Sequence, residues 1–427
     1  MKNIMIRLLS AFIWNKQSRK RFRDKYIIKK NTPTNTQLNK ELNQLDIDEY
    51  ASWITDLKNN KSFFVPFTND NFVRKDNDVK VFAYYLPQFH SIDINDNNYG
   101  KGFTEWTNVA SSTPLFSGHY QPKIPYDLGF YNLMQPGVME RQVEIAKAYG
   151  LYGFCFYYYW FSGKKVLEKP LEYFLNSDID FPFHFCWANE NWSKLWDGGD
   201  KEVILKQEAK DDDAEKFFKD ILPFIKDKRY EKINNKPLLM VYRPSLFGKE
   251  YFINFADTLN KLAKKEGFDG FYIMGSNAFG FNDPEGYKCE GIIEFPPHEL
   301  YCSEVETKMI SSNYSTKVFD MSHYIKNKKF IYKPNYKLIK TCFPSWDNTP
   351  RKAYSGGSIY QLTDEEYSYW LSSLLKWTKE NNLDNEQYVY INAWNEWAEG
   401  AILEPTTRYG YKNLQILKDC LENLRKE

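Results

Sequence analysis

The sequence has few of the features that mark membrane-spanning or disulfide-stabilised proteins. No stretch approaches the roughly 18 uncharged apolar residues that a membrane-spanning helix needs. The six cysteines lie far apart and form no C-x-x-C pair. Cys155 and Cys186 lie inside apolar runs, where a buried reduced thiol is the ordinary state. The first apolar stretch is not followed by an A-x-A-like signal cleavage site. These absences predict a cytoplasmic protein that is soluble or peripheral on the membrane.

Several catalytic motifs are also missing. The five histidines show no H-E-x-x-H spacing, and no G-x-S-x-G is present, which argues against a zinc hydrolase and a serine esterase. No glycine-rich phosphate-binding motif opens a helix, which disfavours a doubly wound nucleotide-binding sheet. Asp178 and Asp180 form a D-x-D triplet that resembles the metal-binding motif of many nucleotide-sugar transferases. We expect that neither a metal nor an organic cofactor is required.

Net charge is nearly absent, whereas aromatic residues are abundant. The 57 Lys and Arg residues almost balance the 56 Asp and Glu residues, which argues against a nucleic-acid partner. The chain has 12 Trp, 32 Tyr and 32 Phe residues. Flat apolar faces with polar edges suit a site that holds sugars, but an aromatic-rich core would give the same composition.

The N-terminal residues 1–78 differ from the rest of the chain and predict an accessory segment. Residues 1–30 contain ten Lys and Arg and one acidic residue, and an apolar section, Ile4–Trp14, precedes most of the cations. Such a segment fits peripheral attachment to an anionic membrane on the cytoplasmic side. The alternative is an ordinary amphipathic helix packed on the outside of the main domain.

Residues 79–427 show one rhythm of short apolar strands and amphipathic helices, which predicts an α/β protein with a (β/α)8 barrel. The predicted strands are Val81–His90, Gly153–Trp160, Pro182–Glu190, Pro237–Tyr242, Gly270–Asn277, Gly291–Phe295, Leu338–Pro344 and Tyr388–Glu396. The predicted helices include Val138–Tyr149, Asp213–Ile225, Tyr251–Glu266, Glu365–Lys379 and Lys412–Lys426.

Each predicted strand begins apolar and ends in polar or aromatic residues. In a barrel of parallel strands these ends meet at one face, where active sites form. The predicted site residues at or near strand ends are Gln88, His90, Tyr158, Trp160, Trp187, Asn189, Glu190, Trp192, Glu294, Trp346, Asn395 and Trp397. Glu105 and Trp106, on the long loop after the first strand, are predicted to close over the site.

The last strand carries a pair of glutamates. Glu396 and Glu399 are three residues apart, so a continuous strand would point them to opposite faces. Ala398 and Gly400 allow the chain to leave the strand there, which would turn both carboxylates into one mouth. Cleavage of a glycosidic bond needs two such carboxyl groups, one as proton donor and one as base or nucleophile.

Five ordered motifs carry a resemblance to a known family. They are Ala83–His90, Gly102–Asn108, Pro114–Pro122, Cys186–Trp192 and Asn392–Gly400. Together they resemble the WbsX-like family, which is related to glycoside hydrolase family 99. The resemblance covers about residues 80 to 410. It implies a (β/α)8 fold and a place in the biosynthesis of bacterial surface polysaccharides of the O-antigen type.

The resemblance also implies roles for the two glutamates. Glu396 would be the base that acts on the sugar 2-hydroxyl, and Glu399 would be the acid that protonates the leaving oxygen and later activates water. The route implied by the family passes through a 1,2-anhydro sugar. This sequence has Ala398 where the hydrolases have His, which puts an α-mannoside substrate in question.

Three functions fit these observations. The first is an enzyme that cleaves or rearranges a glycosidic bond of a surface polysaccharide or its lipid-linked intermediate, using Glu396 and Glu399. The second is a glycosyltransferase of lipopolysaccharide biosynthesis. The third is a barrel that binds glycans without catalysis.

Overall fold

The structure, a computed structural model, describes residues 44–194 and 199–426. The segment expected to bind a membrane, residues 1–30, lies outside the described residues. The chain divides into two compact units. One contains α4 (Gln44–Asn59), Leu115–His119 and Lys308–Asn313, and the other contains the remainder of residues 60–427. Within the described ranges, none of the helices is both long and apolar enough to cross a bilayer.

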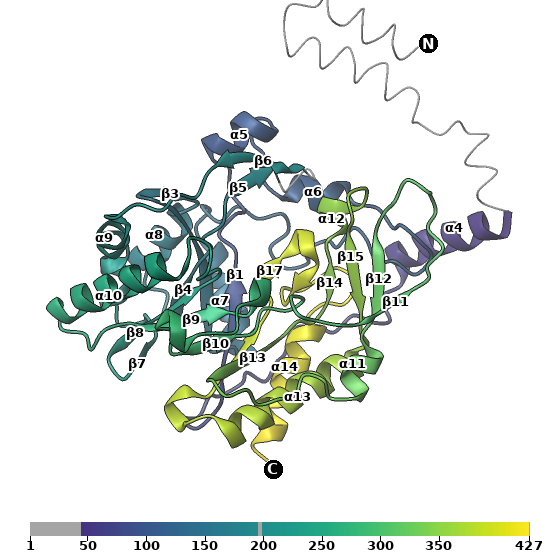
Figure 1. The fold of residues 1–427 in the computed structure, drawn as a ribbon. Helices are drawn as coiled ribbons and strands as arrows, with labels where there is room; N and C mark the ends of the chain where they lie inside the picture. The colour runs from purple at the N-terminus through teal and green to yellow at the C-terminus, as the bar shows by residue number, and fades with distance from the viewer. Residues whose placement is uncertain (1–43, 195–198, 427) are drawn as a thin grey trace, which may run out of the picture. The chain divides into compact units, whose positions relative to one another are not determined.

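Eight parallel strands close into a barrel in the larger unit (Figure 1). The strands are β1 (Lys80–Tyr85), β2 (Gly153–Phe161), β4 (Phe183–Trp187), β8 (Lys236–Val241), β9 (Tyr272–Ser276), β10 (Gly291–Ile293), β13 (Leu338–Cys342) and β16 (Tyr388–Ile391). They pair in the order β1-β16-β13-β10-β9-β8-β4-β2, and β2 pairs again with β1. The predicted (β/α)8 barrel is confirmed.

Side chains alternate between the inside of the barrel and the layer under the helices. Along β1, Phe82 and Tyr84 pack with residues from all the other barrel strands, which only the barrel interior can bring together. Val81, Ala83 and Tyr85 pack instead with helix residues. Both faces are therefore buried, as is usual for parallel sheets covered by helices.

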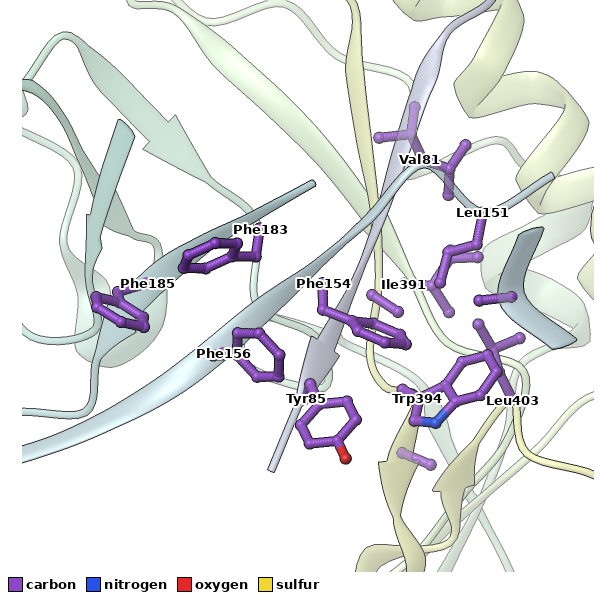
Figure 2. Packing of buried hydrophobic residues seen from close by; sticks show 14 of the residues in the cluster. Val81, Tyr85, Leu151, Phe154, Phe156, Phe183, Phe185, Ile391, Trp394 and Leu403 are labelled. Atoms are coloured by element: carbon purple, nitrogen blue, oxygen red, sulfur yellow. The ribbon is translucent and has the colours of Figure 1, made fainter. Parts of the chain in front are cut away.

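Much of the aromatic content lies in the layer between the barrel and the helices. Figure 2 shows Tyr85, Phe154, Phe156, Phe183 and Phe185 of neighbouring strands with their rings gathered there. Their ring centroids lie within the range of favourable aromatic pairs, for example 4.8 Å between Tyr85 and Phe156. The abundance of aromatic residues is explained largely by this core.

Helices follow most barrel strands. The larger unit contains α5 (Asp93–Tyr99), α6 (Trp106–Ser111), α7 (Val138–Ala148), α8 (Lys169–Asn176), α9 (Asp213–Lys226), α10 (Lys249–Lys265), α11 (Ser322–Lys326), α12 (Thr349–Lys352), α13 (Asp364–Asn381) and α14 (Lys412–Leu424). Short 3-10 helices are η2 (Ala278–Gly280), η3 (Glu285–Tyr287), η4 (Asp384–Glu386) and η5 (Trp397–Glu399). Helix α13 begins with a capping box in which Thr363 and Glu366 bond each other's backbone N–H.

Short additional strands form within the loops. They are β3 (Lys164–Val166), β5 (Trp192–Lys194), β6 (Gly199–Leu205), β7 (Lys232–Ile233), β11 (Ser303–Val305), β12 (Lys317–Asp320), β14 (Trp346–Asp347), β15 (Ser358–Gln361), β17 (Asn395–Glu396) and β18 (Ala401–Ile402). Most of them follow the carboxyl ends of barrel strands, as do α5, α6, α12 and η5, so they build the face where barrel active sites form.

The segment that leads into the barrel is attached to the larger unit. Val65 forms a β-bridge with Gly410, and Phe72 is buried with its backbone N–H donating to Ala148. Arg74 donates to the carbonyl of Gly150 at 2.8 Å. Residues 60–79 therefore pack with the barrel.

Candidate active site

A pocket of about 200 Å³ opens at the carboxyl ends of the barrel strands. Residues from several strand ends and loops line it: Leu86, Gln88, Tyr157, Tyr159, Cys186, Ala188, Glu190, Asn191, Trp192, Ser193, Tyr242, Phe295, Arg351, Glu396 and Glu399. We refer to it as the first pocket. Both predicted glutamates line it.

A tight turn brings the two glutamates to the same pocket. Strand β17 ends at Glu396, and η5 follows at once and ends at Glu399. Gly400 then adopts a left-handed conformation with φ of 64°, where a side chain would be strained. A Cβ at this position would also approach Nζ of Lys123 to 2.6 Å. The expectation that the chain leaves the strand at this point is confirmed.

Arg351, which lines the first pocket, bonds three carboxyl groups. Its Nη1 donates to Glu399 at 2.6 Å, and its Nη2 donates to Glu396 at 2.7 Å. Nε and Nη2 also form a two-point contact with Glu105, whose other neighbour is the side-chain amide of Gln88. Arg351 comes from the short helix α12, 45 residues before Glu396.

Burial shapes the electrostatics of this cluster. Burial raises the pKa of Glu396 well above its ordinary value; the guanidinium of Arg351 opposes the shift, and the carboxylates of Glu399 and Glu105 add to it. Burial likewise raises the pKa of Glu105, against the opposing effect of Arg351. One cation therefore bonds three carboxyl groups, and burial makes Glu396 and Glu105 hold a proton more readily than an exposed glutamate does.

A fourth carboxyl group, that of Glu404, stabilises the turn that carries Glu396 and Glu399. Glu404 is buried and accepts from the indole N–H groups of Trp394 (3.1 Å) and Trp397 (2.6 Å). It also accepts from Gln142 (2.7 Å) and Tyr131 (2.8 Å). Burial raises the pKa of Glu404 to about 7, although all four donors act in the opposite direction. These bonds fix the two tryptophans that flank Glu396.

The structure brings three of the predicted binding residues to the first pocket and a fourth directly behind it. Gln88, Glu190 and Trp192 line the pocket. Glu190 is partly exposed and pairs with Arg243 at 3.0 Å. Glu105 is fully buried behind the pocket wall, where it bonds Arg351, and so does not close over the site as a loop residue would.

The other predicted tryptophans and Tyr158 pack elsewhere. Tyr158, Trp160 and Trp187 lie on the outer face of their strands, against Phe217 of α9. The remaining three are buried, with their indole N–H groups donating to neighbouring groups: Trp106 to the Tyr131 carbonyl, Trp346 to Ser358 and Trp397 to Glu404. None of the six lines the first pocket.

The other four predicted residues do not line the first pocket. Asn189 braces its loop by two 2.8 Å bonds with the backbone of Arg243. Asn395 joins the turn that carries Glu396 to the residue after β1, through both backbone groups of Leu86. His90 is buried, which lowers its pKa to about 4. Glu294 pairs with the buried Lys340 and lines a different pocket.

The family model for "Glycosyltransferase WbsX" matches residues 81–417. The chain belongs to the WbsX family. Two curated relatives, both named "Uncharacterized protein WxcX" and from two strains of Xanthomonas campestris pv. campestris, are 36% identical over 342 residues. The matched region covers 79% of this chain and 49% of each relative, so the chain spans about half the length of the curated relatives it matches.

One solved structure supports the same fold, and two others match with lower scores. A "Glycoside hydrolase-like protein" has a TM-score of 0.54 at 12% identity, covering 84% of this chain and 98% of that one. Two structures of the GH99 endo-alpha-mannosidase from Bacteroides thetaiotaomicron have TM-scores of 0.48 and 0.45 at 12% and 14% identity, covering 83% of this chain and 99% of theirs. At 12% identity, the match to the glycoside hydrolase-like protein supports the fold alone. The family match and the closed barrel together indicate a WbsX-family protein with a (β/α)8 fold.

Several pocket residues of this WbsX-family chain carried no signal in the sequence. Arg351 lies in a four-residue helix, without a motif to mark it. Tyr157 and Tyr159 line the first pocket, whereas the intervening Tyr158 points outward. Alternation along the strand would have distinguished Tyr157 and Tyr159 from Tyr158 only if the inward face had been known.

Metal ions in proteins are bound by particular groups of side chains. Among the described residues, there is no group of three or more His, Cys, Asp or Glu side chains that could hold one. Asp178 and Asp180 lie between α8 and β4, before the strand begins, and Asp180 is exposed beside Lys147. The expectation that no cofactor is needed stays a prediction.

Proposed function

We propose that this chain cleaves or transfers a glycosidic bond of a bacterial surface polysaccharide or its lipid-linked intermediate, with Glu396 and Glu399 as the reacting groups. One observation carries the proposal. The two carboxylates line one pocket at the carboxyl face of a closed barrel and bond the same guanidinium, at 2.7 and 2.6 Å. Paired carboxyl groups on either side of one bond are the common requirement of glycosidic chemistry.

In the first step, Glu396 acts as a base. Its carboxylate takes the proton of the sugar 2-hydroxyl while the 2-oxygen attacks C1 and forms a 1,2-anhydro ring. The bond between C1 and the glycosidic oxygen breaks, and the carboxylic acid of Glu399 gives its proton to that oxygen. The raised pKa of Glu396 makes its carboxylate a stronger base than an exposed glutamate.

In the second step, the roles reverse. The Glu399 carboxylate takes a proton from water, or from the hydroxyl of an acceptor sugar, and the freed oxygen attacks C1. The bond between C1 and the 2-oxygen breaks, and Glu396 returns its proton to that oxygen. Both glutamates are then in their initial states, so the choice between water and acceptor decides between hydrolysis and transfer.

Arg351 acts as a positioning residue in this scheme. It holds both carboxylates at fixed points, and its positive charge opposes the rise in the pKa of Glu396 that burial causes. Without that charge fewer Glu396 side chains would be ionised at neutral pH. Glu105, which bonds two nitrogens of Arg351, fixes the guanidinium in turn.

Attachment to the membrane would place the enzyme beside lipid-linked substrates. Residues 1–30 combine an apolar section with a dense group of cations. Such segments lie in the interface of anionic membranes. We therefore place the enzyme on the inner face of the cytoplasmic membrane.

A second candidate is glycosyl transfer from a sugar nucleotide. The description of the matching family favours it. In that case the leaving group would be a nucleotide, and the acceptor hydroxyl would replace water.

Incubation of the full chain with free and lipid-linked bacterial glycans, with and without sugar nucleotides, separates the two candidates. Release or rearrangement of sugars without a nucleotide supports cleavage through Glu396 and Glu399. Strict dependence on a nucleotide supports the second candidate. Binding without any reaction under either condition would favour a barrel that only binds glycans.

A further inference from the structure

A second pocket, of about 400 Å³, lies beside the first and has no part in the reaction described above. Its lining comes from the ends of β9, β10 and β13 and from α11 and α13, elements whose places in the fold Figure 1 shows. Tyr324 of α11 and Trp370 of α13 line it, together with Asn277, Glu294 and Thr341 from the strand ends.

The two pockets share a wall. Tyr242 lines the first pocket and His298 lines the second, and the Tyr242 hydroxyl lies 2.9 Å from Nε2 of His298. The adjacent residues Phe295 and Pro296 line the first and the second pocket respectively. A glycan with one sugar unit in the first pocket can therefore place a nearby unit in the second pocket.

The lining of the second pocket matches the chemistry of a sugar ring. Trp370 and three tyrosines, Tyr301, Tyr324 and Tyr332, supply apolar faces with polar edges. The indole N–H of Trp370 is buried, and it has no hydrogen-bond partner among the described residues. An unpartnered buried donor is costly, so a ligand hydroxyl that reached this N–H through a small movement of the side chain would be stabilised.

The charges of the lining favour a neutral ligand. Glu294 and Glu299 contribute two carboxylates against the single ammonium of Lys329. Glu294 is already paired with Lys340, at 2.8 Å. Burial lowers the pKa of His298, so its ring is neutral near pH 7. Without an excess of positive charge, the second pocket is poorly suited to a phosphate or a carboxylated sugar.

We propose that the second pocket binds a neutral pyranose unit of the same glycan whose glycosidic bond lies in the first pocket. The pocket is then a recognition site that selects the glycan by a sugar outside the reacting pair. The link to a reacting bond rests on the proposed function, but the binding of a neutral sugar does not.

Ligand-observed NMR with neutral methyl pyranosides (glucose, galactose, mannose, rhamnose and N-acetylglucosamine) tests this. The full chain carries Glu396→Gln, so that turnover does not interfere, and glucose 1-phosphate is the anionic comparison. Tyr332 and Tyr369 are matched in exposure, at 42% and 41%, but only Tyr332 lines the pocket. Tyr332→Ala should weaken binding of at least one pyranoside about tenfold, and Tyr369→Ala should leave it unchanged.

Trp370→Phe provides a second comparison, with Trp377→Phe on the same helix as its control. It removes the unpartnered N–H and part of the aromatic face that lines the pocket, so it should also weaken binding. The proposal is overturned if no neutral pyranoside binds, if both tyrosine variants lose affinity equally, or if binding is unaffected by Tyr332→Ala. Tighter binding of glucose 1-phosphate that depends on Tyr332 would overturn the neutral class. Failure of the catalytic proposal would appear differently, as turnover retained by Glu396→Gln.

Discussion

Glu396 Oε1 accepts a 2.7 Å hydrogen bond from Nη2 of Arg351, although the two residues are 45 positions apart in the chain. The same guanidinium reaches Glu399 through Nη1 at 2.6 Å. The two carboxylates are therefore held by one rigid planar group, whose donors are fixed relative to each other. This geometry sets the spacing of the proposed reacting groups, and the charge of Arg351 opposes the raised pKa of Glu396.

Replacing Arg351 should change the pH dependence of the reaction. Glu396 must be ionised to act as a base, and its pKa already lies well above the ordinary value, so activity should fall on acidification at a pH where an exposed glutamate is still ionised. Arg351→Met removes the charge that opposes this rise, and should move the acid limb of kcat/KM upward by about 1–3 pH units. The neighbouring variant Lys352→Met should leave the limb in place. An unmoved limb in Arg351→Met would rule out this role.

Of the tryptophans predicted as site residues, Trp192 lines the first pocket. Its ring packs edge-on against Tyr159, with centroids 5.0 Å apart. Binding of the substrate glycan should change intrinsic tryptophan fluorescence, and Trp192→Phe should remove most of that change. Trp160→Phe and Trp187→Phe should preserve it, because both rings lie under α9. A full response in Trp192→Phe would place the glycan elsewhere.

Glu404 should make folding stability depend on pH. Burial raises its pKa to about 7 from an ordinary value of 4.5, so between these pH values the folded protein binds a proton that the unfolded chain does not. The associated stability is present below about pH 4.5 and is lost as pH rises through about 7, a loss of roughly 3 kcal/mol. The free energy of unfolding, measured with urea across this pH range, should decline less in Glu404→Gln than in the wild type.

The exposed variant Glu215→Gln is the control for this measurement and should keep the wild-type decline. Equal slopes in wild type and Glu404→Gln would show that Glu404 does not take up the proton.

Membrane attachment through residues 1–30 is testable on the full chain. Neutralising Arg19, Lys20, Arg21 and Arg23 to Gln should weaken sedimentation with anionic vesicles at low salt by about 4 kcal/mol, roughly a thousandfold. High salt should release the wild-type protein. Neutralising four exposed lysines of α9 and α10 (Lys219, Lys261, Lys264 and Lys265) should have little effect. Similar losses in both variants would indicate a general charge effect without a specific anchor.

The barrel could be predicted because each of its strands and helices has a recognisable local sequence pattern. All eight predicted strands are present, with ends that differ by a few residues where loops begin. The turn at Gly400 was also predictable, since small residues after Glu396 permit the chain to leave the strand.

Which face of a strand points inward was harder to predict. The β2 segment Gly153–Phe161 is apolar or aromatic throughout, because both of its faces are buried. Sequence alternation is absent in such strands, so Tyr158 and Trp160 appeared as suitable as Tyr157 and Tyr159. Arg351 was not predictable because its three partners lie far away in the chain, up to 246 residues in the case of Glu105.

The central claim is that Glu396 and Glu399 act on one bond, and turnover by the single and double Gln variants tests it most directly. The substrate is the glycan from the panel on which the wild type is active. Each single variant should lose about 10²–10⁴-fold in activity while it remains folded by circular dichroism. The double variant should be no more than slightly worse than the weaker single one, because groups that act as a unit do not add. A double variant whose loss equals the product of the single losses, or a single variant that keeps near-wild-type turnover, would contradict the account.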